Sequence, residues 1–275
     1  MACTPRAYVA SVYAGGMTPS GAQPEVDWSR CGALPRRVCT AAELREIDAA
    51  AESMGLPTLV LMENAAWHAA SVAHELVGGR PSDVLVACGK GSNGGDGLAS
   101  ARHLLGLGHR VRLVIAGRLH EAKGDAAVHA RVGHALGVPV DELGAMSEPD
   151  EAVAVLDGPP APGLVLDAVF GTGLSSDPAG PPAQLIELIG LARQRGAGVL
   201  SLDAPSGLMT DTGRPGSRCV TADATVTFAA MKPGFLTPGA SSRTGRVIVA
   251  PIGVPPRLLE SAGIAWRDDR GPEHA

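Results

Sequence analysis

Three short segments of this 275-residue sequence place ionisable residues and glycines where predicted buried strands end. They are 89–97 (GKGSNGGDG), 167–177 (DAVFGTGLSSD) and 203–207 (DAPSG). In each segment an apolar run gives way to carboxylates, amides or hydroxyls, and small residues leave backbone amides accessible. Ligands of open parallel sheets bind beyond the carboxyl ends of the strands. We therefore expect the three segments to line one shared pocket.

The glycine-rich segment matches the pattern GxGxxG between a predicted strand and a predicted helix, with Gly89, Gly91 and Gly94 at the three positions. Free amides at such a helix start attract phosphate. However, Arg118 rather than an acidic residue stands after the next predicted strand, so the ribose-reading group of an NAD enzyme is missing. Asp96 would repel a pyrophosphate seated there, and it is better placed to bind a hydroxyl or amide. The alternative is a tight glycine turn in which Asp96 only caps the helix.

Two aspartates, Asp167 and Asp203, lie where apolar strands end, and either carboxylate could instead simply anchor a loop amide. Asn93, Asp167 and Ser206 can together supply hard oxygen ligands to a cation. Such ligands suit an alkali or alkaline-earth ion rather than zinc. The histidines form no ligand cluster: His129, for example, is expected on a helix surface.

The elements that position these segments alternate along the chain. A capping box, Thr40 with Glu43, starts a helix that Gly55 ends. Apolar runs predict buried strands and polar–apolar periodicity predicts helices. The strands are 84–88, 111–116, 164–170, 198–202, 224–229 and 246–252, and the helices are 40–54, 58–77, 96–107, 122–136, 150–156 and 182–195. This alternation predicts a doubly wound α/β sandwich.

Composition limits the classes of function. The 28 acidic and 23 basic residues give a net charge of −5, which provides no basic footprint for nucleic acid or an anionic membrane. Five scattered cysteines without a CxxC motif indicate a reducing compartment, and we expect a cytoplasmic protein. We predict a flexible leader over 1–37, one folded domain over 38–258 and a tail over 259–275.

Several motifs, in order and spacing, resemble the YjeF N-terminal-domain family, the NAD(P)HX epimerases, over about residues 38–256. They are LMENA at 61–65, NGGDG at 93–97, DAVFGTGL at 167–174, DAPSG at 203–207, TF at 227–228 and KPG at 232–234. The resemblance implies a Rossmann-like three-layer sandwich with a mainly parallel central sheet, commonly dimeric and using a potassium ion. It also implies interconversion of the R and S forms of NADHX and NADPHX, the hydrated forms of NADH and NADPH. A separate ATP- or ADP-dependent dehydratase would then restore the S form.

The resemblance also implies roles for individual residues. Asp203 is the expected proton-transfer group, and potassium would be held by Asn93, Asp167 and Ser206, the set already suggested by ligand chemistry. The residues expected to contact the hydrated cofactor are Ser92, Asn93, Gly94, Gly95, Asp96, Gly171, Thr172, Gly173, Leu174, Ser175, Ser176, Asp177 and Asp203.

The sequence departs from the family pattern at three positions. Ser92 stands where the family usually has an asparagine, Ala66 replaces a usual glycine, and Ala204 replaces a branched residue. These changes leave open an epimerase or lyase recruited to another metabolite, with the same fold and pocket. A non-catalytic binding module and a plain NAD(P) dehydrogenase are further alternatives. Carboxylates at three strand ends argue against the binding module, and the missing ribose-reading acid argues against the dehydrogenase.

Overall fold

A computed structural model of the protein describes residues 24–144, 154–267 and 271–272. Its centre is an eight-stranded sheet in which every neighbouring pair of strands is parallel. The strands, in spatial order, are β1 (Val26–Asp27), β9 (Arg246–Ala250), β8 (Ala224–Phe228), β7 (Gly198–Leu202), β6 (Leu164–Ala168), β3 (Asp83–Cys88), β4 (Arg110–Ala116) and β5 (Val140–Leu143). The predicted fold class, an α/β sandwich with a mainly parallel sheet, is confirmed.

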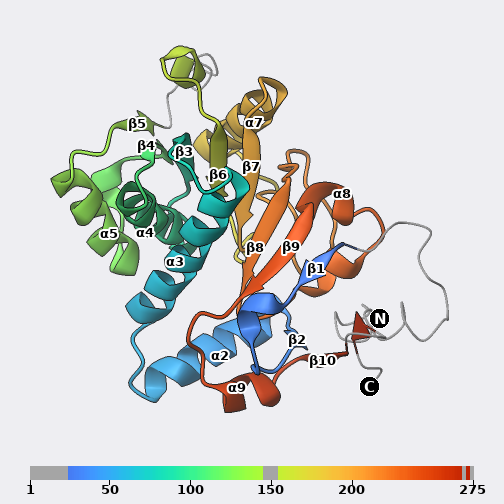
Figure 1. The fold of residues 1–275 in the computed structure, drawn as a ribbon. Coiled ribbons are helices and arrows are strands. Elements are labelled where there is room, and N and C mark those ends of the chain that lie inside the picture. The colour runs from blue at the N-terminus through green and yellow to red at the C-terminus, as the bar shows by residue number, and fades with distance from the viewer. Residues whose placement is uncertain (1–23, 145–153, 268–270, 273–275) are drawn as a thin grey trace.

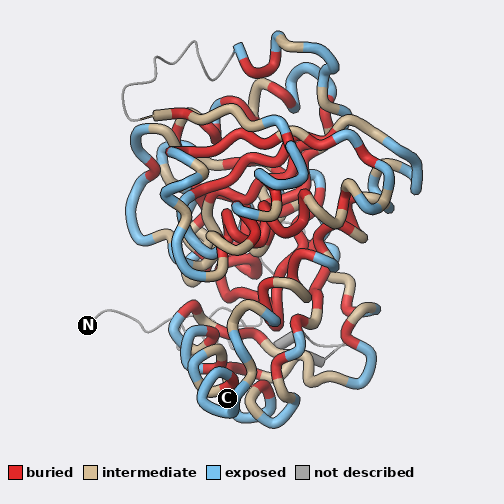
Figure 2. Tube along the Cα trace, turned by 90° about the vertical axis from the view of Figure 1, so that its left-hand side faces the viewer, coloured by how far each residue is buried: buried red, intermediate tan, exposed pale blue. Residues whose placement is uncertain are grey.

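Helices cover both faces of this sheet (Figure 1). The longer helices are α2 (Ala41–Ser53), α3 (Thr58–Leu76), α4 (Ser92–Gly106), α5 (Gly124–Ala135) and α7 (Pro181–Gln194), and the short ones are α8 (Ser241–Thr244) and α9 (Pro256–Glu260). Alternate residues of each strand point to opposite faces. Val84 and Val86 join the core under α3 and α4, whereas Leu85 joins the core under α7. The strands therefore form a buried centre in Figure 2.

The order of the strands creates a switch point between β3 and β6. From β3 the chain adds β4 and β5 on one side, then returns to the other side of β3 for β6, β7, β8 and β9. The connections on the two sides diverge at this point and leave a crevice beyond the carboxyl ends of the strands, where ligands bind in such sheets. The segments after β3, β6 and β7 are the three that the sequence singles out.

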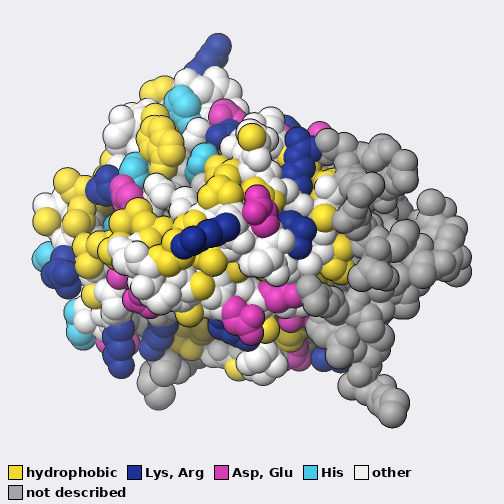
Figure 3. All heavy atoms as spheres, turned by 90° about the horizontal axis from the view of Figure 1, so that it is seen from below, with side chains coloured by type: hydrophobic (Ala, Val, Ile, Leu, Met, Phe, Trp, Pro, Cys, Tyr) yellow, Lys and Arg dark blue, Asp and Glu magenta, His cyan; other side chains and the backbone are white. Residues whose placement is uncertain are grey.

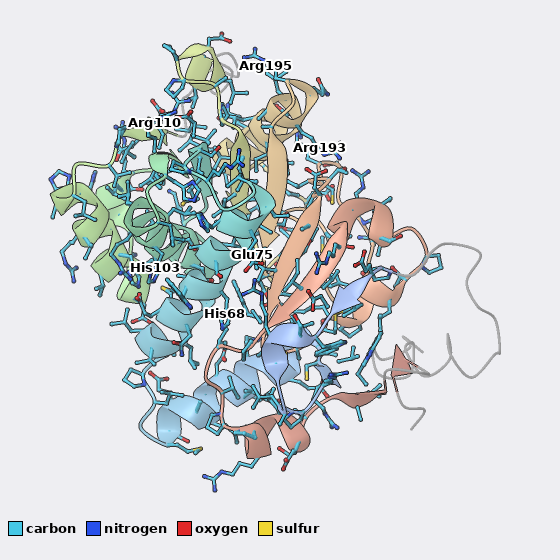
Figure 4. The ribbon with its side chains drawn as sticks, in the orientation of Figure 1. His68, Glu75, His103, Arg110, Arg193 and Arg195 are labelled. Atoms are coloured by element: carbon cyan, nitrogen blue, oxygen red, sulfur yellow. The ribbon has the colours of Figure 1, made fainter. Side chains whose placement is uncertain are left out.

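At the amino ends of the strands, on the side of the sheet opposite the crevice, surface ion pairs link neighbouring elements. Arg110 at the start of β4 contacts Asp83 at 2.5 Å, and Arg193 near the end of α7 contacts Asp223 at 2.7 Å. Arg110, Arg193 and Arg195 all lie in the upper half of Figure 4. The carboxyl ends point instead toward α2 at the bottom of Figure 1. Figure 3, which views the molecule from that lower side, shows basic, acidic and hydrophobic side chains interspersed.

The folded unit extends beyond the predicted boundaries at both ends. Residues 24–37, predicted as part of a flexible leader, include β1 and the 3-10 helix η1 (Ser29–Cys31), and Trp28 is buried with Val247 and Val249 of β9. β10 (Ile264–Arg267), in the predicted tail, pairs with β2 (Arg37–Val38) and with β11 (Gly271–Pro272). These strands are too short for a sequence pattern to reveal, and the rest of the predicted leader lies outside the described residues.

Other elements agree with the sequence or correct it in detail. The capping box at Thr40 and Glu43 is present at the start of α2. His129, expected at the surface, is buried at 6% exposure, because Ala126 and Ala130 turn that face of α5 toward the core. Two further 3-10 helices are η2 (Leu119–Glu121) and η3 (Pro233–Leu236). Within the described residues, no helix is both long and apolar enough to cross a bilayer.

Candidate active site

A cavity of about 670 Å³ lies at the switch point, beyond the carboxyl ends of β3, β6, β7 and β8. Its walls come from α2, α3, the start of α4 and the loops that follow these strands. The polar and charged residues that line it are Arg45, Asp48, Thr58, Lys90, Ser92, Asn93, Asp96, Asp125, Thr172, Asp203 and Lys232. Apolar side chains such as Met62 and Phe228 complete the lining. A cavity of this size and mixed lining is typical of a small-molecule site.

Asp203, directly after β7, is held in a strained backbone conformation. Its φ of 63° lies in the left-handed region, which costs a non-glycine residue about 1–3 kcal/mol. Its backbone amide donates to Val226 O at 2.7 Å, and its carboxylate accepts from the amides of Thr172 (3.1 Å) and Phe228 (3.4 Å). Among the described residues, the other non-glycine with positive φ is Ala229, which also lines the cavity. Backbone strain is thus concentrated at this site.

Lys232 forms an ion pair with Asp203 in the interior. Its side chain is fully buried, and its Nζ lies 2.6 Å from Asp203 Oδ1. The same ammonium donates to Phe228 O at 2.9 Å and to Ala230 O at 3.1 Å. An ammonium has three protons to donate, so these three acceptors satisfy it completely. The contact fixes the Asp203 carboxylate in one position at the wall of the cavity.

Three further aspartates, Asp48, Asp96 and Asp125, share the cavity with this ion pair, and two of them have a raised pKa. Burial, reinforced by the negative charge of Asp203, raises the pKa of Asp48 to about 6, and Lys232 opposes that rise. Burial, together with the charges of Asp203 and Asp48, raises the pKa of Asp96 well above its usual range. The cavity therefore contains four carboxyl groups and one buried cation, and a carboxyl such as Asp48 can exchange a proton near neutral pH.

The glycine-rich segment forms the first turn of α4 rather than a loop before it, because the helix begins at Ser92 and not near Asp96. A Cβ at Gly94 would lie 2.0 Å from Gly89 O, so only glycine lets this turn approach the end of β3 so closely. The helix has no side-chain cap, which leaves its first amides available to an anionic ligand. Asn93 is 8% exposed, and neither its Oδ1 nor its Nδ2 has a hydrogen-bond partner within the described residues.

Asp167 and Ser206 contact each other where β6 and β7 end. Ser206 donates to the Asp167 carboxylate from its Oγ at 2.5 Å and from its amide at 2.8 Å, and Ser201 Oγ donates at 2.8 Å. The Asp167 side chain is fully buried, and burial raises its pKa despite these hydrogen bonds. In the described part of the chain, no Lys or Arg forms an ion pair with it. A buried carboxylate without a basic partner suits a bound cation.

The cavity brings together some of the predicted ligand-contacting residues and not others. Ser92, Asn93, Asp96, Gly171, Thr172, Gly173 and Asp203 line it. Gly94 and Gly95 are buried inside the first turn of α4 and do not line the cavity. The second half of the predicted loop, Leu174, Ser175, Ser176 and Asp177, also lies outside the lining, and Asp177 accepts a hydrogen bond from the amide of Ser217 at 3.2 Å. Asp167 and Ser206 lie outside the lining as well.

Asp48 and Lys232 are among the cavity residues missing from the predicted set. A signal for Asp48 exists in the sequence, because it falls four residues after Leu44 and three before Ala51 on the apolar face of α2. A carboxylate on a buried face is unusual enough to indicate a function. For Lys232, the sequence offers only its place in the KPG motif, since its contact with Asp203 joins residues 29 positions apart.

A parallel sheet with a ligand-sized cavity at its switch point defines a Rossmann-like α/β ligand-binding protein. Similarity to known proteins identifies the family within this class. Residues 58–234 match the family described as YjeF-related protein N-terminus, and the chain belongs to that family. A solved yeast protein, ynu0 (YNL200c), shares the fold with a TM-score of 0.62 at 23% identity, over 72% of this chain and 82% of the yeast chain.

Relatives with assigned names share more of the sequence. An NAD(P)H-hydrate epimerase of Rhodopirellula baltica is 38% identical over 84% of this chain and 89% of its own length. A bifunctional NAD(P)H-hydrate repair enzyme of Moorella thermoacetica is also 38% identical, over 80% of this chain. The matched region is only 41% of the Moorella protein, so the chain spans less than half of that bifunctional relative.

Proposed function

We propose that the protein is an NAD(P)H-hydrate epimerase, which interconverts the R and S forms of hydrated NADH and NADPH. The observation that carries the proposal is the Asp203–Lys232 ion pair at the wall of the switch-point cavity, in a chain that is 38% identical to a named epimerase over 84% of its length. The free amides at the start of α4 offer a place for the anionic part of such a ligand.

The chemistry required at the cavity is modest. In the hydrated cofactor a hydroxyl group is attached to the ring carbon next to the ring nitrogen. The nitrogen lone pair can expel this hydroxyl once the hydroxyl takes up a proton, and water can return to either face of the planar cation. The carboxylate of Asp203 is the group that accepts a proton from the returning water. Lys232 and the amide of Thr172 hold that carboxylate in place.

We also propose that Asn93, Asp167 and Ser206 hold a potassium ion. Support comes from the unpartnered amide of Asn93 and from the buried carboxylate of Asp167, both hard oxygen donors. A bound ion would supply positive charge close to the ligand. Thermal unfolding in potassium chloride and in lithium chloride at equal ionic strength tests this. We expect a higher melting temperature in potassium and no difference for Ser206→Ala, whereas equal melting temperatures of the wild type in both salts would contradict it.

The partners follow from the same proposal. The substrates are NADHX and NADPHX, and the product would pass to an ATP- or ADP-dependent dehydratase. Bifunctional repair enzymes among the relatives support such a functional link. The predicted homodimer and the cytoplasmic location stay predictions.

The direct test uses the purified R epimer of NADHX with the protein in potassium buffer, and follows the S epimer by chromatography. We expect equilibration at catalytic amounts of protein, well above the spontaneous rate. An unchanged R epimer in the presence of folded protein would contradict the proposal. Protection of the protein by a different metabolite in that case would favour the recruited epimerase or lyase.

A further inference from the structure

We propose that Asp48 is a second proton-transfer group of the cavity and works as an acid–base partner of Asp203 across the bound ring. This inference rests on the proposed epimerase function and deepens it. Asp203 alone can serve one face of the ring, whereas epimerisation requires a hydroxyl to leave from one face and water to enter from the other. A second carboxyl on a different wall of the cavity meets that need.

The placement of Asp48 supports this role. Asp48 lies on α2, whereas Asp203 lies in the loop after β7, so the two carboxyls enter the cavity from separate elements. Leu44, four residues earlier, lines the same cavity, as expected for residues on one face of a helix. Asp48 is half-buried, and no hydrogen bond or ion pair holds its carboxylate within the described residues. It is therefore available to a ligand.

The charges around Asp48 set its protonation relative to that of Asp203. Lys232 contacts Asp203 directly at 2.6 Å, whereas burial and the negative charge of Asp203 raise the pKa of Asp48 to about 6. The other charged groups that face the cavity are Arg45 on the same helix, Lys90 after β3, Asp96 on α4, Asp125 on α5, Asp203 after β7 and Lys232 after β8. Asp125 accepts a hydrogen bond from Thr58 Oγ1 at 2.5 Å. Asp48 therefore carries a proton below a pH of about 6.

The cavity also contains an independent sign of a ligand. The amide of Asn93, more than nine-tenths buried, lines the cavity without a hydrogen-bond partner in the described part of the chain. An unpartnered buried amide costs stability unless a ligand satisfies it. A cation held by its Oδ1 would still leave the Nδ2 donor without a partner, and a molecule bound in the cavity can satisfy it.

The proposed step balances in protons and electrons. The carboxylic acid of Asp48 gives its proton to the hydroxyl, the C–O bond breaks with its electron pair on oxygen, and water leaves. The ring nitrogen carries the resulting positive charge. Water then forms a new C–O bond on the opposite face and gives a proton to the Asp203 carboxylate. Exchange with solvent returns the proton from Asp203 to Asp48, and the opposite epimer reacts with the roles of the two groups reversed.

The test compares Asp48→Asn with Glu46→Gln, a matched control that removes an exposed charge from the same helix outside the cavity lining. Rates of epimerisation are measured from purified R and from purified S epimer across pH 5–9, after subtraction of the spontaneous rate. General acid–base groups contribute about 10²–10⁴-fold. We expect Asp48→Asn to lower kcat by about 10²-fold or more in both directions, while Glu46→Gln matches the wild type.

The pH profile separates proton transfer from a structural role. Wild-type kcat should fall as the pH rises above the pKa of Asp48, about 6, and this fall should be missing from the residual activity of Asp48→Asn. Asp48→Glu, which keeps the carboxyl, should recover part of the rate and restore the fall. Wild-type kcat and an unchanged profile for Asp48→Asn would overturn the inference while leaving the epimerase function intact. A wild type without activity would instead overturn the proposed function itself.

Discussion

The buried ammonium of Lys232 lies 2.6 Å from Asp203 Oδ1, and this contact joins the segments that follow two adjacent strands, β7 and β8. The two residues face a cavity whose other walls carry Asp48 and Asp96. A fixed carboxylate opposite a carboxyl that can be protonated near neutral pH is an arrangement suited to moving protons. The proposed epimerase activity depends on that arrangement.

Replacement of Lys232 should lower the stability of the folded protein. Lys232→Met leaves Asp203 without its buried cation and two carbonyls without a donor, so the free energy of unfolding should fall by about 3–5 kcal/mol. Lys90→Met is the matched control, because Lys90 lines the same cavity but is exposed, with Glu121 at 3.3 Å, and such pairs contribute roughly 0–1 kcal/mol. Urea unfolding measures the loss of free energy of unfolding in each of the two variants. Equal losses in the two variants would contradict the structural role of the buried ion pair.

Gly171 should be sensitive because of the space that Asp203 needs. A Cβ at Gly171 would lie 2.7 Å from Asp203 Oδ2, whereas a Cβ at Gly173 would have no neighbour within 4 Å. We expect Gly171→Ala to displace the carboxylate and lower kcat by about 10²-fold, the effect of a misplacement near 1 Å. Gly173→Ala, in the same loop, would add a methyl group to the cavity lining but leave the Asp203 carboxylate in place, so it should lower kcat much less. Steady-state kinetics that show equal activity in the two variants would argue against a requirement for the observed position of Asp203.

Glycines at the two ends of α4 should respond in opposite ways. The Cβ of Gly94→Ala would meet Gly89 O at 2.0 Å, and such crowding costs about 1–3 kcal/mol. Gly106, in the last turn, has nothing within 4 Å, so Gly106→Ala should stabilise the helix by roughly 0.5–1 kcal/mol. Calorimetry measures both changes. Destabilisation by Gly106→Ala as large as that by Gly94→Ala would show that the close approach to β3 is not the cause.

The raised pKa of Asp48 predicts how stability depends on pH. Asp48 binds its proton more tightly in the folded protein, with a pKa of about 6, than in the unfolded chain. Its favourable contribution to folding is therefore complete below a pH of about 4. That contribution is lost as the pH rises through 6. Asp48→Asn should then melt at the wild-type temperature at low pH and above it at pH 8. A melting temperature below that of the wild type at pH 8 would contradict the origin of the shift in burial and in the Asp203 charge.

The sequence was sufficient to predict the main elements that lie in the core. The apolar runs of β3 and β7 and the capping box at Thr40 are local patterns, and the structure confirms them. The strands β1 and β10 were missed because they are short and depend on contacts with distant segments. The same limit applies at the site. Ser92, Asn93 and Asp203 follow from motifs, whereas the contact of Lys232 with Asp203 exists only after the chain has folded.

The most direct test measures epimerisation by the wild-type protein and by a variant that lacks the proposed proton-transfer group, the carboxylate of Asp203. A mixture of R- and S-NADHX is incubated with an ATP-dependent dehydratase that uses only the S epimer, and regenerated NADH is followed by absorbance until the reaction stalls. Catalytic amounts of wild-type protein should then release the remaining R fraction, and folded Asp203→Asn should release it at least about 10²-fold more slowly. Persistence of the R fraction with the wild type, or full activity of Asp203→Asn, would contradict the account.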